Sequence, residues 1–201
     1  MARLSREESQ EITRTKLLAA ARALFVQNGY GMTSLDRIAD EAGFSKGAVY
    51  SNFSGKEDLF LEVLEEQGRT TLDRLMTALM TAGDDPEAAI DCIATWSDAV
   101  SKSGNWPMLV LEHARHTQNA ERRTEVQENI FLTYWRMLGE KVCAALPLGN
   151  HPPELVGAMV FELTYAPAMS LVAKPTAGDL VRFALTSMIN LSDATNAGKT
   201  T

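Results

Sequence analysis

The sequence predicts an all-α protein of about nine helices, with a small three-helix part at the N-terminus and a larger helical part after it. Glycine, proline and helix-capping residues divide the 201 residues into segments. Within most segments, apolar residues recur at intervals of three and four, which is the period of one face of a helix. Strand-like alternation of apolar and polar residues is almost absent, so a β-sheet is not expected.

Four helices are expected in the first part of the chain. Their starts carry serine or threonine caps and their ends carry glycine, as at Gly29 and Gly43. The second helix is capped by Thr33 or Ser34, the third by Ser45. They cover about residues 9–28, 33–42, 45–53 and 54–79.

Five longer helices are expected beyond residue 83. They cover about residues 85–100, 105–116, 120–146, 153–172 and 177–191. The last two are apolar nearly all round, whereas a helix on the surface of a globular protein has a polar face. We therefore expect the last two helices to be covered by other parts of the protein.

Composition places the chain among ordinary globular proteins. It is 45% hydrophobic and 22% charged. No segment approaches the run of about eighteen apolar residues that crosses a membrane, and the N-terminus lacks the apolar core of a secretion signal. We expect a cytoplasmic protein without a membrane partner. Cys92 and Cys143 lie too far apart for a zinc motif and are too few for a disulfide framework.

The net charge of −7 conceals an uneven distribution. Residues 1–56 hold eight Lys or Arg against six Asp or Glu, so the rest of the chain carries the whole acidic excess. The first quarter is therefore suited to meet a polyanion, while the remainder repels one.

The second and third expected helices have the spacing of a helix-turn-helix. Ala39 lies where the two helices would cross, Gly43 stands at the turn, and Val49 would pack back. The outer face of the third helix would then be free to enter a DNA major groove, with Lys46 and Tyr50 for phosphate and base contacts. The alternative is a structural helical hairpin in which Tyr50 merely packs.

The segment "TSLDRIADEAGFSKGAVYSNFSGKEDLF" resembles the DNA-binding signature of the TetR family of transcriptional regulators. The resemblance implies a homodimer with a helix-turn-helix domain in residues 1–55 and a ligand-binding and dimerisation domain in residues 56–201. It also implies a double-stranded DNA operator and a small-molecule effector as partners. The family's DNA contacts, carried over by position, fall on Thr33, Ser45, Lys46, Gly47, Ala48, Tyr50, Ser51, Asn52 and Lys56. Ser51 and Asn52 stand where many relatives have a histidine or aromatic pair, which leaves the operator sequence open.

Aromatic residues and methionines gather in the middle of the chain, where the resemblance implies a ligand cavity. Such residues at helical spacing also form ordinary cores, and that alternative stays open for each of them. Methionine nevertheless fills adaptable pockets well. The candidate wall residues are Trp106, Trp135 and Tyr165, followed by Met76, Trp96 and Phe131.

The ninth expected helix presents two apolar ridges. Leu180, Ala184 and Met188 form one, and Val181, Leu185 and Ile189 form the other. One ridge can face the core of its own protomer, which leaves the other for a partner. A symmetric four-helix contact built from the last two helices is the expected dimer interface.

The stretch "EHARH" is the one place that suggests metal or enzyme chemistry, because Glu112 and His116 are one helical turn apart beside His113. Zinc needs three or four converging ligands, and no second pair at suitable spacing accompanies this one. No nucleophile elbow, phosphate loop or dinucleotide motif is present. We therefore expect no enzyme, no metal and no cofactor, and a solvated or lightly paired helix face at "EHARH".

These observations favour a dimeric repressor that binds a palindromic operator and is released by a small, largely apolar or aromatic molecule. An activator and a regulator that senses no ligand are alternatives within the same class. A helical hydrophobe-binding protein is the alternative outside it. The identity of the effector and of the regulated genes does not follow from the residues.

Overall fold

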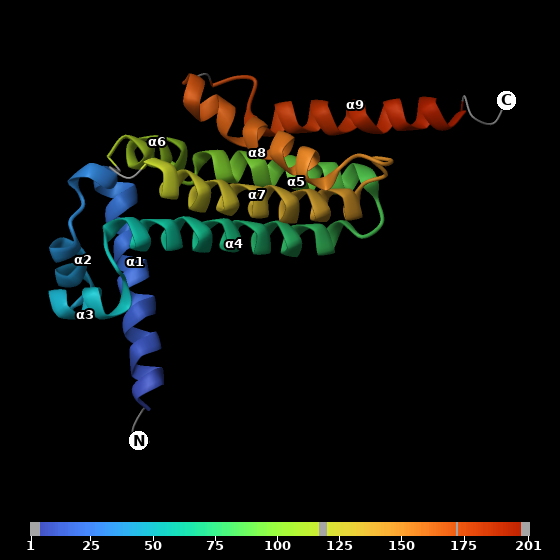
Figure 1. The fold of residues 1–201 in the computed structure, drawn as a ribbon. Coiled ribbons are helices and arrows are strands. Elements are labelled where there is room, and N and C mark those ends of the chain that lie inside the picture. Colours follow the sequence, from blue (N-terminus) through green and yellow to red (C-terminus); the bar gives the residue numbers. More distant parts are fainter. Residues whose placement is uncertain (1–4, 117–119, 172, 198–201) are drawn as a thin grey trace. The chain divides into compact units, whose positions relative to one another are not determined.

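The computed structural model describes residues 5–116, 120–171 and 173–197 and confirms the all-α fold. Nine α-helices follow one another within these ranges (Figure 1). They are α1 (Arg6–Met32), α2 (Leu35–Ala42), α3 (Lys46–Asn52), α4 (Lys56–Ala82), α5 (Pro86–Lys102), α6 (Trp106–His116), α7 (Ala120–Ala145), α8 (Pro153–Ser170) and α9 (Ala177–Ala197). The eighth helix was expected to reach Val172, which lies outside the described residues; α8 ends at Ser170, before Leu171 in a left-handed conformation.

The chain forms two compact units. The first consists of Met1–Gln67 together with Trp106–Arg123, and the second of Gly68–Asn105 together with Thr124–Thr201. The division therefore runs through α4 and through the first turns of α7, and it assigns α6 to the N-terminal unit. These two compact units differ from the two domains that the sequence analysis divided after residue 55. That domain boundary stays a prediction.

In the first unit, α2 and α3 form the expected helix-turn-helix beside α1 (Figure 1). Ser34 caps α2 by accepting the amide of Arg37. Gly43 ends α2 with φ 74°, a left-handed conformation that is strained for residues other than glycine. Ala39 and Val49 are both fully or almost fully buried. The small residue and the apolar one therefore hold the two helices together as the spacing predicted.

The helix α1 is longer than expected, because Gly29 interrupts it rather than ending it. Gly29 has φ 82° and ψ 167°, and a further helical turn follows up to Met32. Glycine adopts this backbone conformation without the steric cost that other residues meet. The chain thus changes direction just before the helix-turn-helix begins.

The second unit has an apolar core to which five helices contribute. Its members include Leu75 of α4, Ile93 of α5, Leu138 of α7, Val160 of α8 and Leu185 of α9. Helix α9 packs on α5 and α8. Helices α8 and α9, which are apolar nearly all round, are thus covered on one side by this core.

Helices α7 and α8 approach each other at a pair of glycines. A Cβ on Gly139 would lie 1.7 Å from the carbonyl oxygen of Pro153, and one on Gly157 would lie 1.8 Å from that of Trp135. Both distances are far below van der Waals contact, so any side chain would force the helices apart. The glycines therefore set how closely α7 and α8 pack.

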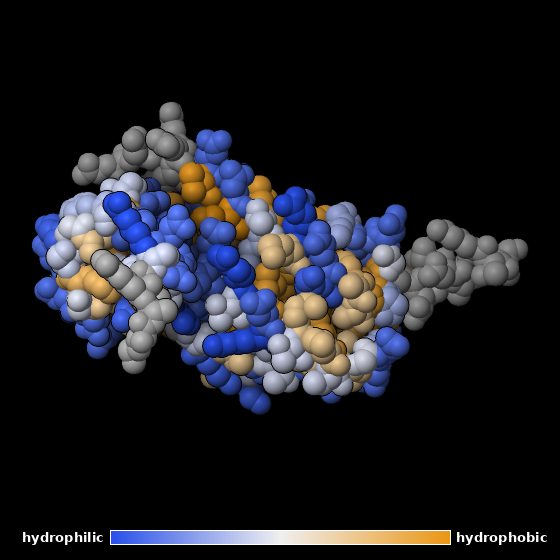
Figure 2. Space-filling model, turned by 90° about the horizontal axis from the view of Figure 1, so that it is seen from below, coloured by the Kyte–Doolittle hydropathy of each residue, from blue (hydrophilic) through white to orange (hydrophobic). Residues whose placement is uncertain are grey.

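Hydrophobic and hydrophilic residues are interspersed on the face of the molecule that Figure 2 shows. Several large apolar side chains of the described residues are exposed, such as Met80, Leu155 and Phe183. None of the described helices combines the length and the apolar character that a membrane crossing requires.

Candidate nucleic-acid interface and ligand cavity

The outer face of α3 carries small and polar side chains that are open to solvent. Ser45, Lys46, Gly47 and Ser51 are exposed, and Tyr50 is 54% exposed. Ser45 caps α3 by accepting the amide of Ala48 through its hydroxyl oxygen, so the hydroxyl proton is left to donate elsewhere. A face of this size and chemistry is suited to lie in a major groove.

Lys46 is held beside α2 by an exposed ion pair. Its Nζ lies 2.8 Å from Oδ1 of Asp36. The hydrogen bond to Asp36 raises the pKa of Lys46, so its ammonium is charged at neutral pH. A phosphate that binds Lys46 must share it with this carboxylate or displace it.

The structure does not support Thr33 as a phosphate contact. The residue is 2% exposed. Its hydroxyl lies 2.7 Å from the carbonyl oxygen of Gly29 and 3.2 Å from that of Leu24. Its backbone amide donates to Tyr30. The donors of Thr33 therefore close the turn after Gly29, and Ser34 rather than Thr33 caps α2.

Asn52 turns back onto its own helix. Its Nδ2 donates to the carbonyl oxygen of Ala48, 2.7 Å away, and the same oxygen accepts the hydroxyl of Ser51 at 2.9 Å. The side-chain oxygen of Asn52 is buried and has no hydrogen-bond partner among the described residues. Base recognition by Asn52 would require a change of rotamer, whereas Tyr50 already faces solvent.

Arg14 joins three helices, which the sequence did not reveal. Its guanidinium forms an ion pair with Glu62 of α4 and donates to the carbonyl oxygen of Asn52, 2.7 Å away. The Cζ atom lies 4.5 Å from the centre of the Phe53 ring. This cation thus fixes the end of α3, although it had been counted with the charges available to DNA.

Lys56 lies over an aromatic ring rather than fully in solvent. Its Nζ is 4.2 Å from the centre of the Tyr30 ring. Burial lowers the pKa of Lys56, and the negative charge of Glu112 opposes that shift. Lys56 therefore remains a candidate phosphate contact with part of its charge already engaged.

Three of the six candidate ligand residues meet around one ring of the second unit. The ring of Phe161 lies 5.6 Å from that of Phe131, 6.2 Å from that of Trp135 and 4.7 Å from that of Tyr165. Burial raises the pKa of Tyr165 to about 12. Trp135 Nε1 is buried without a hydrogen-bond partner among the described residues. The cluster is thus largely apolar, with one donor unused.

The remaining ligand candidates do not join this cluster. Trp106 belongs to the first unit, and Met76 is half-buried on α4. Trp96 lies on α5, and its Nε1 donates to the carbonyl oxygen of Thr71, 2.9 Å away.

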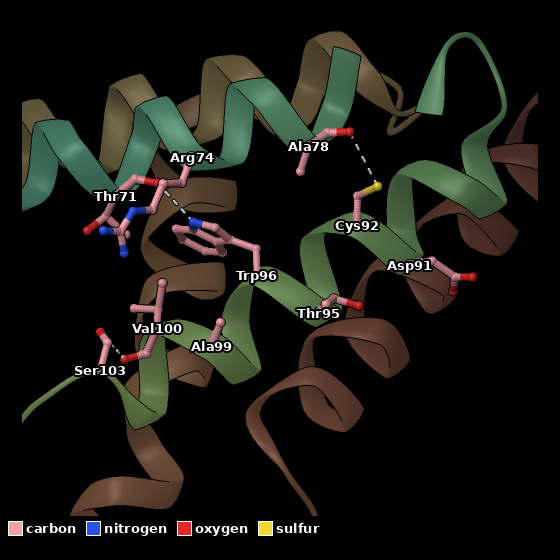
Figure 3. Close-up of a pocket in the computed structure, with 10 residues that line it drawn as sticks. All are labelled: Thr71, Arg74, Ala78, Asp91, Cys92, Thr95, Trp96, Ala99, Val100 and Ser103. Atoms are coloured by element: carbon pink, nitrogen blue, oxygen red, sulfur yellow. Dashed lines mark hydrogen bonds between the residues drawn. The ribbon is translucent and has the colours of Figure 1, made fainter. Parts of the chain in front are cut away.

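Trp96, one of the candidate wall residues, lines a cavity between α4 and α5 whose other lining residues were not among the candidates (Figure 3). Its volume is about 370 Å³, within the range of small-molecule sites. Asp91 lies on one side and is ion-paired with Arg182 of α9. Arg74 of α4 is the cation that a bound anion would meet. The other lining residues are Thr71, Ala78, Cys92, Thr95, Ala99, Val100 and Ser103.

The two ridges of α9 have different environments. Val181 and Leu185 are fully buried in the core of the unit, so they are not available to a partner. Leu180 and Ala184 are half-buried, as are Met188 and Ile189. Among the side chains of α9 whose burial is described, the most exposed large apolar ones are Phe183 at 76% and Leu191 at 67%, and neither was among the predicted interface residues.

Glu112 and His113 of the "EHARH" stretch are less exposed than the solvated or lightly paired helix face that we expected. His113 is fully buried and stacks on Phe60, with 4.6 Å between ring centres. Glu112 accepts hydrogen bonds from two backbone amides of α1. Ala114, Arg115 and His116 are exposed. Among the described residues, no three potential metal ligands converge.

Comparisons with known proteins agree with this geometry. Residues 17–63 match the family described as "Bacterial regulatory proteins, tetR family". The HTH-type transcriptional activator FasR of Mycolicibacterium smegmatis is 32% identical over 111 residues, which cover 55% of this chain and 49% of the relative. The HTH-type transcriptional repressor KstR2 of Rhodococcus jostii is 31% identical over 119 residues, which cover 57% and 56%. The matches thus span about half the length of these relatives.

The fold extends the likeness over most of the chain. The crystal structure of the transcriptional regulator FadR from Bacillus subtilis in complex with stearoyl-CoA superposes with a TM-score of 0.59 at 18% identity. The alignment covers 87% of this chain and 97% of that one. At such identity the likeness concerns the fold alone.

Proposed function

Because this chain belongs to the TetR family of bacterial regulatory proteins, we propose that it is a transcriptional regulator that binds a palindromic DNA operator as a homodimer. The observation that carries the proposal is the exposed outer face of α3, on a helix held to α2 by the buried Ala39 and Val49. A second copy would present the same face to the other half-site, one helical turn of DNA away.

The proposed DNA contacts are those that face solvent. Lys46 supplies a phosphate contact, Tyr50 and Ser51 reach toward the groove, and Gly47 lets the backbone approach it. Ser45 donates its hydroxyl to a phosphate at the start of the helix. Asn52 and Lys56 act only after rearrangement, because both are engaged within the protein.

We assign the dimer contact to α8 and α9 and revise its residues. Phe183, Leu191 and Leu155 are exposed apolar side chains on these two helices. Leu180 and Ala184 are half-buried on the same helix. Burial of such residues against their symmetry mates would remove a large apolar area from water.

We propose that the regulator is a repressor released by a small, largely apolar or aromatic molecule. Curated relatives include an activator and a repressor, so an activator is the alternative. The cavity beside Trp96 supports ligand binding, and Arg74 would favour a molecule with an acidic group. Helix α4 lines the cavity with Thr71, Arg74 and Ala78 and continues into the first unit, so it is one covalent route by which such binding would reach that unit.

Selection of duplexes from random-sequence DNA by the full-length protein tests DNA recognition. We expect one palindromic sequence to be enriched and its binding to weaken steeply as salt is raised. If the protein enriches no sequence and binds no DNA at low salt, the proposed function is rejected and the hydrophobe-binding alternative is favoured.

Thermal shift with decanoate and decanol tests the cavity. We expect stabilisation by decanoate to exceed that by decanol, and Arg74→Ala to remove the difference. Ala99→Phe, which fills the cavity, should abolish both responses, whereas Thr77→Phe on the exposed face of α4 serves as the control. Equal responses of the Ala99→Phe variant and the unaltered protein would reject this cavity as the ligand site.

A further inference from the structure

The break in α1 leaves backbone donors that the helix itself does not satisfy. Gly29 takes a non-helical conformation with φ 82°. The amides that follow a break are equivalent to those of a new helix start, which lack partners within the helix. Tyr30 and Gly31 are the first two residues after it, and α2 begins only four residues after Gly31.

Glu112 of α6 accepts both of these donors. Its Oε2 lies 2.9 Å from the amide nitrogen of Tyr30, and its Oε1 lies 2.9 Å from that of Gly31. One carboxylate thus spans two successive amides with one oxygen each. Hydrogen bonds from neutral donors to a charged acceptor are stronger than neutral ones, and the start of a helical turn favours an anion.

The surroundings hold Glu112 in this position. The next residue, His113, is fully buried, with its ring 4.6 Å from that of Phe60 and 5.0 Å from that of Tyr30. Lys56 lies 4.2 Å from the Tyr30 ring and places a positive charge near the carboxylate. The aromatic contacts of His113 therefore hold the neighbouring Glu112 in place, and Lys56 provides a counter-charge for its carboxylate.

We propose that Glu112 is a positioning residue for DNA binding. By fixing the break at Gly29–Gly31, it sets the direction in which the chain enters α2 and α3. Thr33 closes the same turn through Leu24 and Gly29. The matched family segment ends at residue 63, so the DNA-binding unit of this chain is completed by a helix from outside that segment.

Glu112→Gln tests the proposal in the full-length protein. Glutamine keeps the size and packing of glutamate but has one acceptor oxygen, so its NH2 group must face one of the two amides. We expect binding to the selected duplex to weaken roughly tenfold, as loss of one charge-assisted hydrogen bond predicts. Removal of a negative charge alone would strengthen binding to DNA, so a loss cannot be a charge effect. Glu128→Gln on α7 is the matched control.

Gly31→Ala provides a second, independent measurement. A Cβ there would lie 2.9 Å from Oε1 of Glu112 and 3.0 Å from Nε2 of His116, so it displaces the carboxylate. We expect Gly31→Ala as a single substitution to weaken duplex binding. In a protein that already carries Glu112→Ala, we expect it to weaken binding little further. Gly29→Ala should remain harmful in both backgrounds, because its φ of 82° strains any side chain.

Amide hydrogen exchange at Tyr30 and Gly31 measures their hydrogen bonds to Glu112 in the absence of DNA. We expect both amides to exchange faster in Glu112→Gln while the amides of α9 keep their rates. Unchanged exchange and unchanged duplex affinity in Glu112→Gln would overturn the proposal. A protein that selects no duplex, but whose Tyr30 and Gly31 amides respond as expected, would refute the proposed function and leave the structural contact standing.

Discussion

Asp98 of α5 accepts the backbone amide of Gly178 in the first turn of α9, with 2.7 Å between Oδ1 and the amide nitrogen. Its other oxygen lies 3.4 Å from the hydroxyl of Thr176. A side chain from one helix thus satisfies donors at the start of another, which the chain supplies 80 residues later. A Cβ on Gly178 would lie only 2.7 Å from the carbonyl oxygen of Ala94, so the glycine allows this approach.

We expect Asp98→Ala to destabilise the second unit by about 1.5–3 kcal/mol, because it removes a charged acceptor from a buried helix start. Urea unfolding followed by circular dichroism measures the change. Asp73→Ala, on the exposed surface of α4, is the control and should change the free energy of unfolding little. Equal stabilities of the two variants would show that the Asp98 contact contributes nothing.

Gly139→Ala should lower the free energy of unfolding by about 1–3 kcal/mol, since the added methyl group meets the backbone of Pro153 and the two helices must separate. Gly47→Ala is the counterpart on α3, where a Cβ meets nothing closer than 3.7 Å. It should raise stability by about 0.5–1 kcal/mol, because alanine favours helix, but weaken binding to the selected duplex. Thermal unfolding and DNA titration of both variants check this opposite pattern.

Arg14 and Lys46 should behave differently although both are cations of the first unit. Lys46→Ala is expected to reduce the slope of log affinity against log salt by about one unit per half-site, because one phosphate contact is lost. Arg14→Met should lower stability and leave that slope unchanged, since its guanidinium is engaged with Glu62 and Asn52. A reduced slope for Arg14→Met would instead assign Arg14 to the DNA interface.

Phe183→Glu should convert a dimer into a folded monomer, because this side chain is 76% exposed in the protomer. Leu185→Glu should unfold the protein, since it places a charge in a fully buried site. Light scattering coupled to size exclusion, with circular dichroism of the same fractions, distinguishes the two outcomes. A dimeric Phe183→Glu variant would move the proposed interface away from this face of α9.

Much of the helical architecture followed from local chemistry. Serine caps, glycine ends and the spacing of apolar residues act within a few positions of the chain, so they predicted the short helices α2 and α3 closely. The burial of Ala39 and Val49 followed from the same local pattern. The solvent exposure of Lys46 and Tyr50 did as well, since the outer face of a helix is determined once its inner face is known.

The roles of Arg14, Thr33 and Glu112 depended on tertiary contacts. Arg14 contacts a residue 48 positions away and Glu112 contacts amides 81 and 82 positions away, distances over which a sequence pattern carries no geometric information. Thr33 matched the pattern of a helix cap, yet its hydroxyl and its amide donate to carbonyl oxygens of α1 instead. For α9, the two apolar ridges were visible in the sequence. Only packing against α5 and α8 decided that Val181 and Leu185 face the core and that Phe183 faces outward. The reason is that burial depends on which neighbouring helix covers each ridge.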